Sequence, residues 1–222
     1  MKKLSVLFLV LLFAFSAGAQ QKFDNEVYFR FGYSNPCWTQ FGADKDWWQQ
    51  WEGTTSRWGL TGEFGTIFML TTLNSNETLA LGLDIDWVSF YWHRFTYEEP
   101  NYMLDMATLR IDSKVGPSLT FSPAKRIAID VYVKADFGWF TGTALIENED
   151  TDEAEGFGDI FAVGLSTGAN FRFSILMVGI EFNTITTKLE NYDESGYYLD
   201  FTDRDSDKSP LPSMNFTVGL SF

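Results

Sequence analysis

The strongest constraint in this sequence is a two-residue alternation of apolar and polar side chains that recurs along the chain. It is clearest at the C-terminus, where Met214, Phe216, Val218, Leu220 and Phe222 alternate with Asn, Thr, Gly and Ser. Successive side chains of a β-strand point to opposite faces, whereas an amphipathic helix repeats its apolar positions at three and four residues. The pattern therefore predicts a chain built of strands.

Eight segments follow this alternation and predict eight strands. Their ranges are 23–33, 57–70, 78–92, 106–121, 127–143, 158–172, 174–187 and 213–222. Most are longer than the five or six residues typical of globular proteins, and a tilted strand needs about 9–11 residues to cross a bilayer. Short connections alternate with longer ones, which are expected at 34–56, 93–105, 144–157 and 188–212. Alternating short turns and long loops are typical of outer-membrane barrels.

A soluble β-sandwich or a lipocalin-like barrel is the alternative, because its strands also alternate. Here the apolar face carries almost no charge, with Ser113 and Pro117 as its exceptions, while the opposite face is rich in charge. A soluble core would not tolerate so many charges. The sequence therefore favours an all-β, eight-stranded antiparallel up-and-down transmembrane β-barrel whose apolar face contacts lipid.

The N-terminus predicts export. Lys2 and Lys3 precede an apolar run over 4–15, and Ala17 and Ala19 fit the small-residue pattern of a cleavage site. This is the pattern of a secretory signal peptide. A membrane anchor is the alternative, but the run is shorter than the roughly 20 residues that a spanning helix needs. We expect a cleaved signal peptide at 1–19 and a barrel domain at 20–222.

These features together resemble the small, porin-like outer-membrane β-barrel domain proteins of Gram-negative bacteria. The resemblance covers the mature chain and includes the closing segment SMNFTVGLSF, which ends on Phe222. In that family the barrel-assembly machinery reads the terminal aromatic residue. The resemblance implies a monomer in the outer membrane, surrounded by its lipid. It does not imply one activity, because the family includes anchors, adhesins, enzymes and small channels.

Composition excludes several other functions. The formal net charge is −14, with one Cys and one His among 222 residues. An acidic chain is a poor partner for nucleic acid, whose phosphates need a basic surface. One Cys cannot form an internal disulfide, and one Cys with one His cannot make a Cys/His zinc site. No cofactor is expected.

The inward-facing side of the predicted strands combines acidic and basic residues. Eight acids and four bases make up this set: Glu26, Arg30, Glu63, Asp84, Asp86, Arg110, Asp112, Lys114, Asp130, Lys134, Asp136 and Glu181. An eight-stranded barrel is just wide enough to be filled by its own side chains, so we expect these charges to pair and close the lumen. The excess of acids leaves a narrow cation-preferring pore as the alternative.

Aromatic residues are expected at two places. One group near the outer strand ends predicts an interface girdle; it comprises Trp58, Trp87, Tyr91, Trp92, Trp139 and Phe140. The connection 34–56 contains Cys37 and four tryptophans, namely Trp38, Trp47, Trp48 and Trp51. These tryptophans either fold onto the barrel rim or form a platform for a surface glycan or a protein partner.

Two of the predicted long loops are acidic. The connection 144–157 contains Glu147, Glu149, Asp150, Asp152, Glu153 and Glu155, without a base. In 188–212, Asp203, Asp205 and Asp207 resemble the start of a calcium loop but lack the Gly and Glu of an EF-hand. These acids are either solvated or form a weak site for a divalent cation.

Catalysis is not expected. Barrel enzymes that act on lipid A need a His beside a Ser nucleophile. The single His is His93, and Ser89 lies four residues earlier on the same strand, roughly 13 Å away. The sequence therefore predicts a structural or surface-interaction protein of the outer membrane, with no catalytic residues.

Overall fold

The computed structural model describes residues 23–37, 54–99, 102–148, 152–187, 191–192 and 209–222. The described residues form nine strands: β1 (Glu26–Pro36), β2 (Thr54–Thr72), β3 (Leu79–Glu99), β4 (Tyr102–Ala124), β5 (Ile127–Asn148), β6 (Asp152–Phe173), β7 (Leu176–Thr187), β8 (Asn191–Tyr192) and β9 (Ser209–Ser221). No helix among them is long and apolar enough to cross a membrane.

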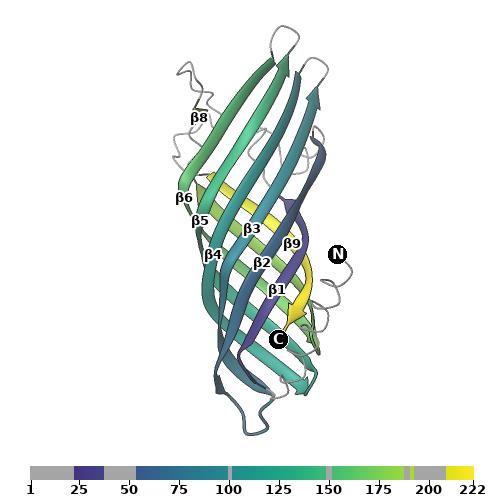
Figure 1. The fold of residues 1–222 in the computed structure, drawn as a ribbon, viewed down its shortest axis with the longest axis vertical. Helices are drawn as coiled ribbons and strands as arrows, with labels where there is room; N and C mark the ends of the chain where they lie inside the picture. The colour runs from purple at the N-terminus through teal and green to yellow at the C-terminus, as the bar shows by residue number, and fades with distance from the viewer. Residues whose placement is uncertain (1–22, 38–53, 100–101, 149–151, 188–190, 193–208) are drawn as a thin grey trace, which may run out of the picture.

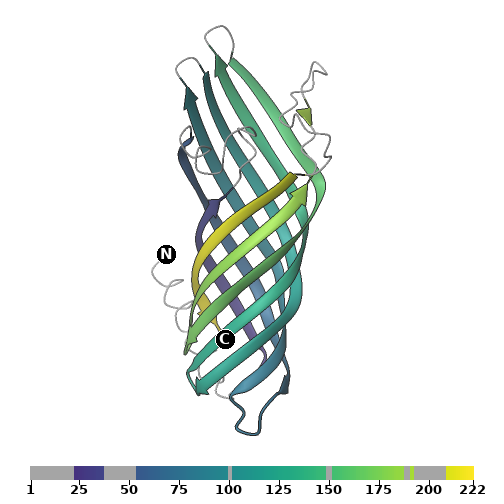
Figure 2. The same ribbon diagram turned by 180° about the vertical axis from the view of Figure 1, so that it is seen from behind.

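Eight of these strands close into a ring. Each pairs antiparallel with its neighbours, β5 pairs with β6, and β9 lies between β7 and β1. Beyond the strand ladders, Val27 and Phe222 exchange two backbone hydrogen bonds of 3.0 and 2.8 Å. The two-residue β8 pairs only with β6, outside the ring. The predicted eight-stranded antiparallel up-and-down barrel is therefore confirmed (Figures 1 and 2).

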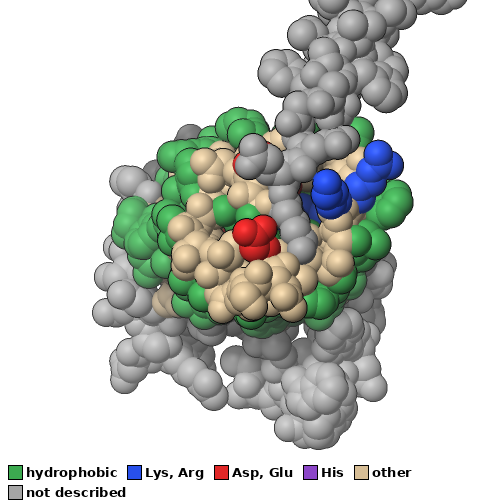
Figure 3. Space-filling model, turned by 90° about the horizontal axis from the view of Figure 1, so that it is seen from below, with side chains coloured by type: hydrophobic (Ala, Val, Ile, Leu, Met, Phe, Trp, Pro, Cys, Tyr) green, Lys and Arg blue, Asp and Glu red, His purple; other side chains and the backbone are tan. Residues whose placement is uncertain are grey.

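Burial in this barrel is the reverse of that in a soluble protein. Along β7, the apolar side chains of Val178, Ile180 and Phe182 are 43–46% exposed, while Glu181 and Asn183 between and beside them are at most 2% exposed. Seen from the turn end, hydrophobic side chains ring the periphery and acidic side chains lie near the centre (Figure 3). A continuous apolar exterior around a charged interior fits a bilayer.

One end of the barrel, here called the turn end, is formed by three tight connections. They join β2 to β3 at 73–78, β4 to β5 at 125–126 and β6 to β7 at 174–175. In the first, the Asn74 Oδ1 accepts hydrogen bonds from the backbone N–H groups of Thr78 and Leu79 at 2.9 and 3.1 Å. β1 begins and β9 ends at this same end. The three short connections lie between the strands where the sequence predicts them.

The opposite end differs from the prediction. The segments 93–105 and 144–157, expected as loops, are mostly strand, and four of the six acids expected in the second loop lie in β5 or β6. The last cross-strand partners before the tips are Glu99 with Tyr102 and Glu147 with Asp152. Here the ladder continues although the apolar alternation stops, because strands that rise beyond the lipid need no apolar face. β3, β4, β5 and β6 thus extend past β1, β7 and β9 as a projecting sheet (Figures 1 and 2).

A bulge in β3 changes which residues face the lumen. The pairing with β4 shifts between Asp86 and Ser89, and the two residues between them, Trp87 and Val88, are both exposed. The outward-facing Ser113 donates a 2.8 Å hydrogen bond to the Trp87 carbonyl at this bulge. This contact explains a polar residue on the apolar face, since the bulge interrupts the ladder there.

The bulge corrects part of the predicted girdle. After it, the alternation is reversed, so Tyr91 points into the lumen and is fully buried. Phe140 of β5 is also buried, at 1% exposure. Trp58, Trp87 and Trp139 remain outside, each 39–47% exposed, where indole rings of an interface girdle lie.

Candidate functional site

The lumen is the best-defined polar site of the described chain. Eleven of the twelve predicted inward charges are at most 3% exposed, and the side chain of Glu26 is 24% exposed at the turn end. Sequence analysis missed one further base, Arg172, which is 4% exposed and also points inward. Its position in the alternation of β6 would have revealed it. Adding Arg172 to the four predicted bases gives five bases against eight acids, an excess of three.

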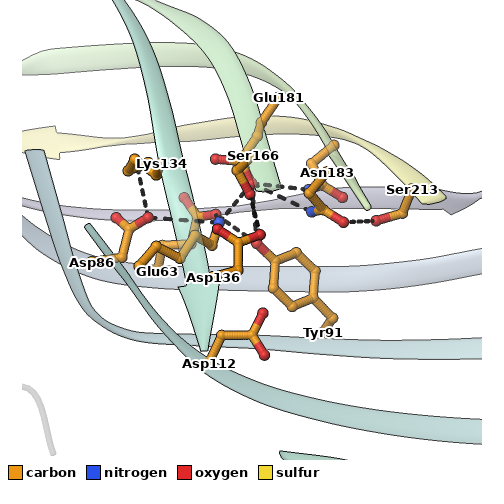
Figure 4. Close-up of polar contacts among 12 residues, drawn as sticks. Glu63, Asp86, Tyr91, Asp112, Lys134, Asp136, Ser166, Glu181, Asn183 and Ser213 are labelled. Carbon is orange, nitrogen blue, oxygen red and sulfur yellow. Dashed lines mark hydrogen bonds and ion pairs between the residues drawn. The ribbon is translucent and has the colours of Figure 1, made fainter. Parts of the chain in front are cut away.

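A three-carboxylate cage occupies the middle of the lumen. Glu63 of β2, Asp86 of β3 and Glu181 of β7 each offer an oxygen, and these oxygens lie within 4.8 Å of one another. Such a group could hold a metal ion, but the Lys114 ammonium from β4 already lies among them. Its Nζ is 2.9 Å from Glu63, 3.6 Å from Asp86 and 2.6 Å from Glu181 (Figure 4). Lys114 thus acts as the cation of the cage.

Two more bases extend the network around the cage. The Lys134 Nζ is 2.6 Å from Asp86 and 3.4 Å from Asp84. The Arg30 guanidinium forms an ion pair with Glu63 and lies 3.5 Å from Glu181. Because each base contacts two or more carboxylates, the charges form one connected network rather than isolated pairs. Buried charges are stable only when they are paired and hydrogen-bonded in this way.

Three buried tyrosines complete the network. The Tyr28 hydroxyl donates to Asp84 at 2.7 Å and also to Asp86. The Tyr91 hydroxyl donates to Glu63 and Glu181 at 3.1 Å, and the Tyr132 hydroxyl donates to Glu181 at 3.0 Å. The Arg110 guanidinium lies over the Tyr91 ring, with its Cζ 3.8 Å from the ring centroid. Glycines make room for these rings, because a Cβ at Gly65 or Gly168 would overlap Tyr28 or Tyr132. Tyrosine suits this position, since its ring fills space and its hydroxyl satisfies a carboxylate.

The turn end of the lumen has its own polar cluster. Arg172 contacts Asp130 through two hydrogen bonds of 2.7 and 2.8 Å and forms an ion pair with Glu26. The Thr120 hydroxyl donates to Asp130 at 2.6 Å. A small apolar group, Tyr28 with Ile67 and Met177, is also fully buried. These side chains fill the lumen below the cage.

His93 has a serine partner that the sequence analysis did not predict. It is 3% exposed, and its Nε2 lies 2.7 Å from the Ser34 hydroxyl of β1. Ser34 donates its single proton to the Asn215 Oδ1 at 2.6 Å, and Asn215 Nδ2 faces Glu181 at 3.4 Å. The Ser34 hydroxyl oxygen must then accept a hydrogen bond from an N–H at His93 Nε2. In this arrangement His93 is not a base for Ser34, although the two side chains touch.

Several predicted site residues lie outside the described part of the chain. They are Trp38, Trp47, Trp48, Trp51, Asp203, Asp205 and Asp207, together with the signal peptide at 1–19. Cys37, at the edge of that loop, is half-buried, and its Sγ donates to the Asn35 carbonyl at 3.5 Å.

A closed eight-stranded barrel with an apolar exterior and a charged interior has the architecture of small outer-membrane β-barrel proteins. No protein-family model and no curated protein sequence matches this chain. Among solved structures it is similar to Ail, the attachment invasion locus protein of Yersinia pestis, at 14% identity and a TM-score of 0.48, over 90% of this chain and 100% of Ail. A second Ail structure, in complex with the heparin analogue sucrose octasulfate, gives 13% and 0.47 over the same shares.

Neisserial surface protein A is more distant, at 9% identity and a TM-score of 0.35, over 89% of this chain and 95% of that protein. At such identities no residue role carries over from these proteins. The fold assignment rests on this chain's own strand pairings, which close the ring.

Proposed function

We propose that this protein is an outer-membrane β-barrel with a closed lumen and a structural or surface-interaction role. The observation that supports it is the Lys114 cage, where one ammonium and three carboxylates from four strands meet in the middle of the barrel. Side chains that fill an eight-stranded barrel leave little room for solutes. Function then lies outside the lumen, on surfaces beyond the lipid.

The projecting sheet is the surface that this proposal assigns to a partner. Its outer strand segments carry seven acids by sequence, while Arg94 is the only base between 94 and 105 and there is none between 144 and 155. The acids are Glu98, Glu99, Asp105, Glu147, Asp152, Glu153 and Glu155. Such a surface favours a partner with positive charge and repels a polyanion. A basic protein partner therefore fits better than a sulfated glycan.

Shortening the two hairpins tests this role. Thr96 and Asp105 are direct cross-strand partners, as are Thr143 and Gly156, so residues 97–104 and 144–155 can each be replaced by an Asn-Gly turn. We expect cells that display the shortened barrel to lose attachment to a surface coated with a basic protein. The full-length barrel should bind that surface and not one coated with heparin.

The control is the heat-dependent gel migration of a folded barrel, which should be the same for both proteins. Unchanged attachment after both hairpins are shortened, with that migration intact, would contradict a role for the projecting sheet.

A cation-preferring pore is the second candidate, and the excess of three acids in the lumen favours it. A pore requires a continuous aqueous path, and the network around Lys114 lies across any such path. Its test is the conductance of the reconstituted wild-type protein in a planar bilayer.

We also propose that the protein is not an enzyme. The direction of the Ser34 and Asn215 hydrogen bonds supports this, because it leaves His93 no proton to accept from the Ser34 hydroxyl. Replacing His93 with Ala should leave the lipid A of the host unchanged. Altered acylation of lipid A in the His93→Ala strain relative to wild type would contradict the proposal.

A further inference from the structure

We infer that the lumen holds a second cation site, distinct from the Lys114 cage, in which Asp136, Asp112 and Ser89 bind a monovalent metal ion such as Na⁺. These three residues form what we call the Asp136 pocket, lined by β3, β4 and β5. The inference does not depend on the proposed surface role, since it concerns only the interior.

Asp136 is the acid that the internal bases leave out. Its Oδ2 accepts a 2.5 Å hydrogen bond from Ser166, while its Oδ1 has no partner and the residue is 1% exposed. Every other lumen acid forms an ion pair with a described base; Asp136 forms none with the described residues. Its direct cross-strand neighbour is Lys114, but the ammonium of Lys114 points into the cage.

Asp112 and Ser89 add oxygens to the same space. They face each other across β3 and β4, and neither the Asp112 carboxylate oxygens nor the Ser89 Oγ makes a hydrogen bond, although both residues are at most 2% exposed. Asp112 also forms an ion pair with Arg110, at 2.7 Å between Oδ2 and Nε. Figure 4 draws Asp112 without a contact to the other labelled residues.

The backbone places these three residues on the lumen-facing side of adjacent strands. The β3 bulge turns Ser89 inward, opposite Asp112. Asp112 in turn leans over Gly138 of β5, where a Cβ would overlap its Oδ1. Gly138 lies two residues from Asp136, about 7 Å along the strand. The carboxylates of Asp112 and Asp136 therefore lie on the lumen-facing side of the adjacent strands β4 and β5, both buried.

The local charge indicates the class of ion. Two carboxylates and the Arg110 guanidinium sum to one negative charge, and a single positive charge would neutralise it. A divalent ion would leave an excess positive charge beside Arg110, which is costly in a buried site. Hard cations of this kind prefer oxygen ligands, and the pocket offers only oxygens. A proton on Asp136 is the competing way to neutralise the pocket.

The test is the stability of the protein refolded into vesicles in sodium chloride or in N-methylglucamine chloride at equal ionic strength. Both are measured at about pH 8, where carboxylic acids of ordinary pKa are ionised. We expect sodium to raise the urea midpoint of the wild type, and the Asp136→Asn variant to lose this dependence. Ser89→Ala, which removes one ligand and no charge, should weaken the sodium dependence.

Asp105→Asn is the matched control, because it makes the same chemical change at an exposed ion pair with Arg94 outside the lumen. It should keep the full sodium dependence. Equal midpoints of the wild type in the two salts would overturn the site in favour of a proton on Asp136. Sodium dependence that persists in Asp136→Asn would also overturn it, because the ion would then bind elsewhere.

Discussion

The Lys114 cage and the Asp136 pocket lie side by side in the lumen but differ in how their carboxylates are neutralised. Lys114 and Asp112 are two residues apart on β4, so both point inward. In the cage, three carboxylates share the Lys114 ammonium and accept hydrogen bonds from three tyrosine hydroxyls. In the pocket, Asp112 pairs with the Arg110 guanidinium, Asp136 has no ion pair with a described base, and several oxygens have no hydrogen-bond partner. The barrel thus closes its centre with its own cation and leaves a charge uncompensated next to it.

The largest loss of stability should come from removing the Lys114 ammonium, the cation of the cage. Lys114→Met keeps most of the side-chain volume but leaves Glu63, Asp86 and Glu181 without the ammonium that they share. Breaking a buried ion pair by removing one partner costs about 3–5 kcal/mol. We expect a loss of this size in the free energy of unfolding, measured by urea titration in vesicles. A loss below about 1 kcal/mol would mean that the cage is not what holds the lumen closed.

Removing the base of the turn-end cluster should cost less stability than removing Lys114. Arg172→Met removes the partner of Asp130 and Glu26, but Glu26 is partly exposed and can be hydrated. Hydrogen bonds to a charged group contribute about 1.5–3 kcal/mol, so we expect a loss in that range by the same titration. Lys125→Met, at an exposed turn residue, is the control and should leave the midpoint in place.

The contact between Ser34 and His93 should contribute less again, because it is neutral. Ser34→Ala leaves a buried imidazole N–H and the Asn215 Oδ1 without their partner, which costs about 1–3 kcal/mol. Thr71→Ala, at an exposed position near the turn end, should have almost no effect. A Ser34→Ala barrel as stable as the wild type would show that these groups find other partners.

The smallest effect should come from the exposed pair of Arg94 and Asp105. Arg94 donates two hydrogen bonds to Asp105, at 3.1 and 2.6 Å, but its side chain is 47% exposed. Exposed pairs contribute little to stability and are screened by salt. We expect Arg94→Ala to lower the urea midpoint only slightly at low salt and by less at high salt. A cost as large as that of Lys114→Met would contradict the distinction between buried and exposed charges.

The sequence predicts the barrel better than it predicts the contacts inside it. Alternation is sufficient to assign faces, so the ring and eleven of the twelve buried charges are where the pattern predicts. It fails where a register changes: the bulge after Asp86 reverses the phase and turns Tyr91 inward. It also fails beyond the lipid, where no apolar face is required and strands continue through an acidic segment.

Contacts between distant strands are the other gap. Ser34 and His93 are 59 residues apart in sequence, and Lys114 reaches Glu181 across 67 residues. Which base meets which acid depends on the stagger of the strands around the ring, and alternation carries no information on stagger. This is why the sequence predicts a charged lumen without distinguishing the cage from the pocket.

Planar-bilayer conductance of the folded wild-type protein tests the closed lumen most directly. The account predicts no reproducible unitary current, because the Lys114 cage fills the centre of the barrel. It also predicts that Lys114→Met introduces small cation-selective steps, since three carboxylates would then line the space that the ammonium leaves. Reproducible cation-selective steps from the wild-type protein would contradict the account and favour the pore.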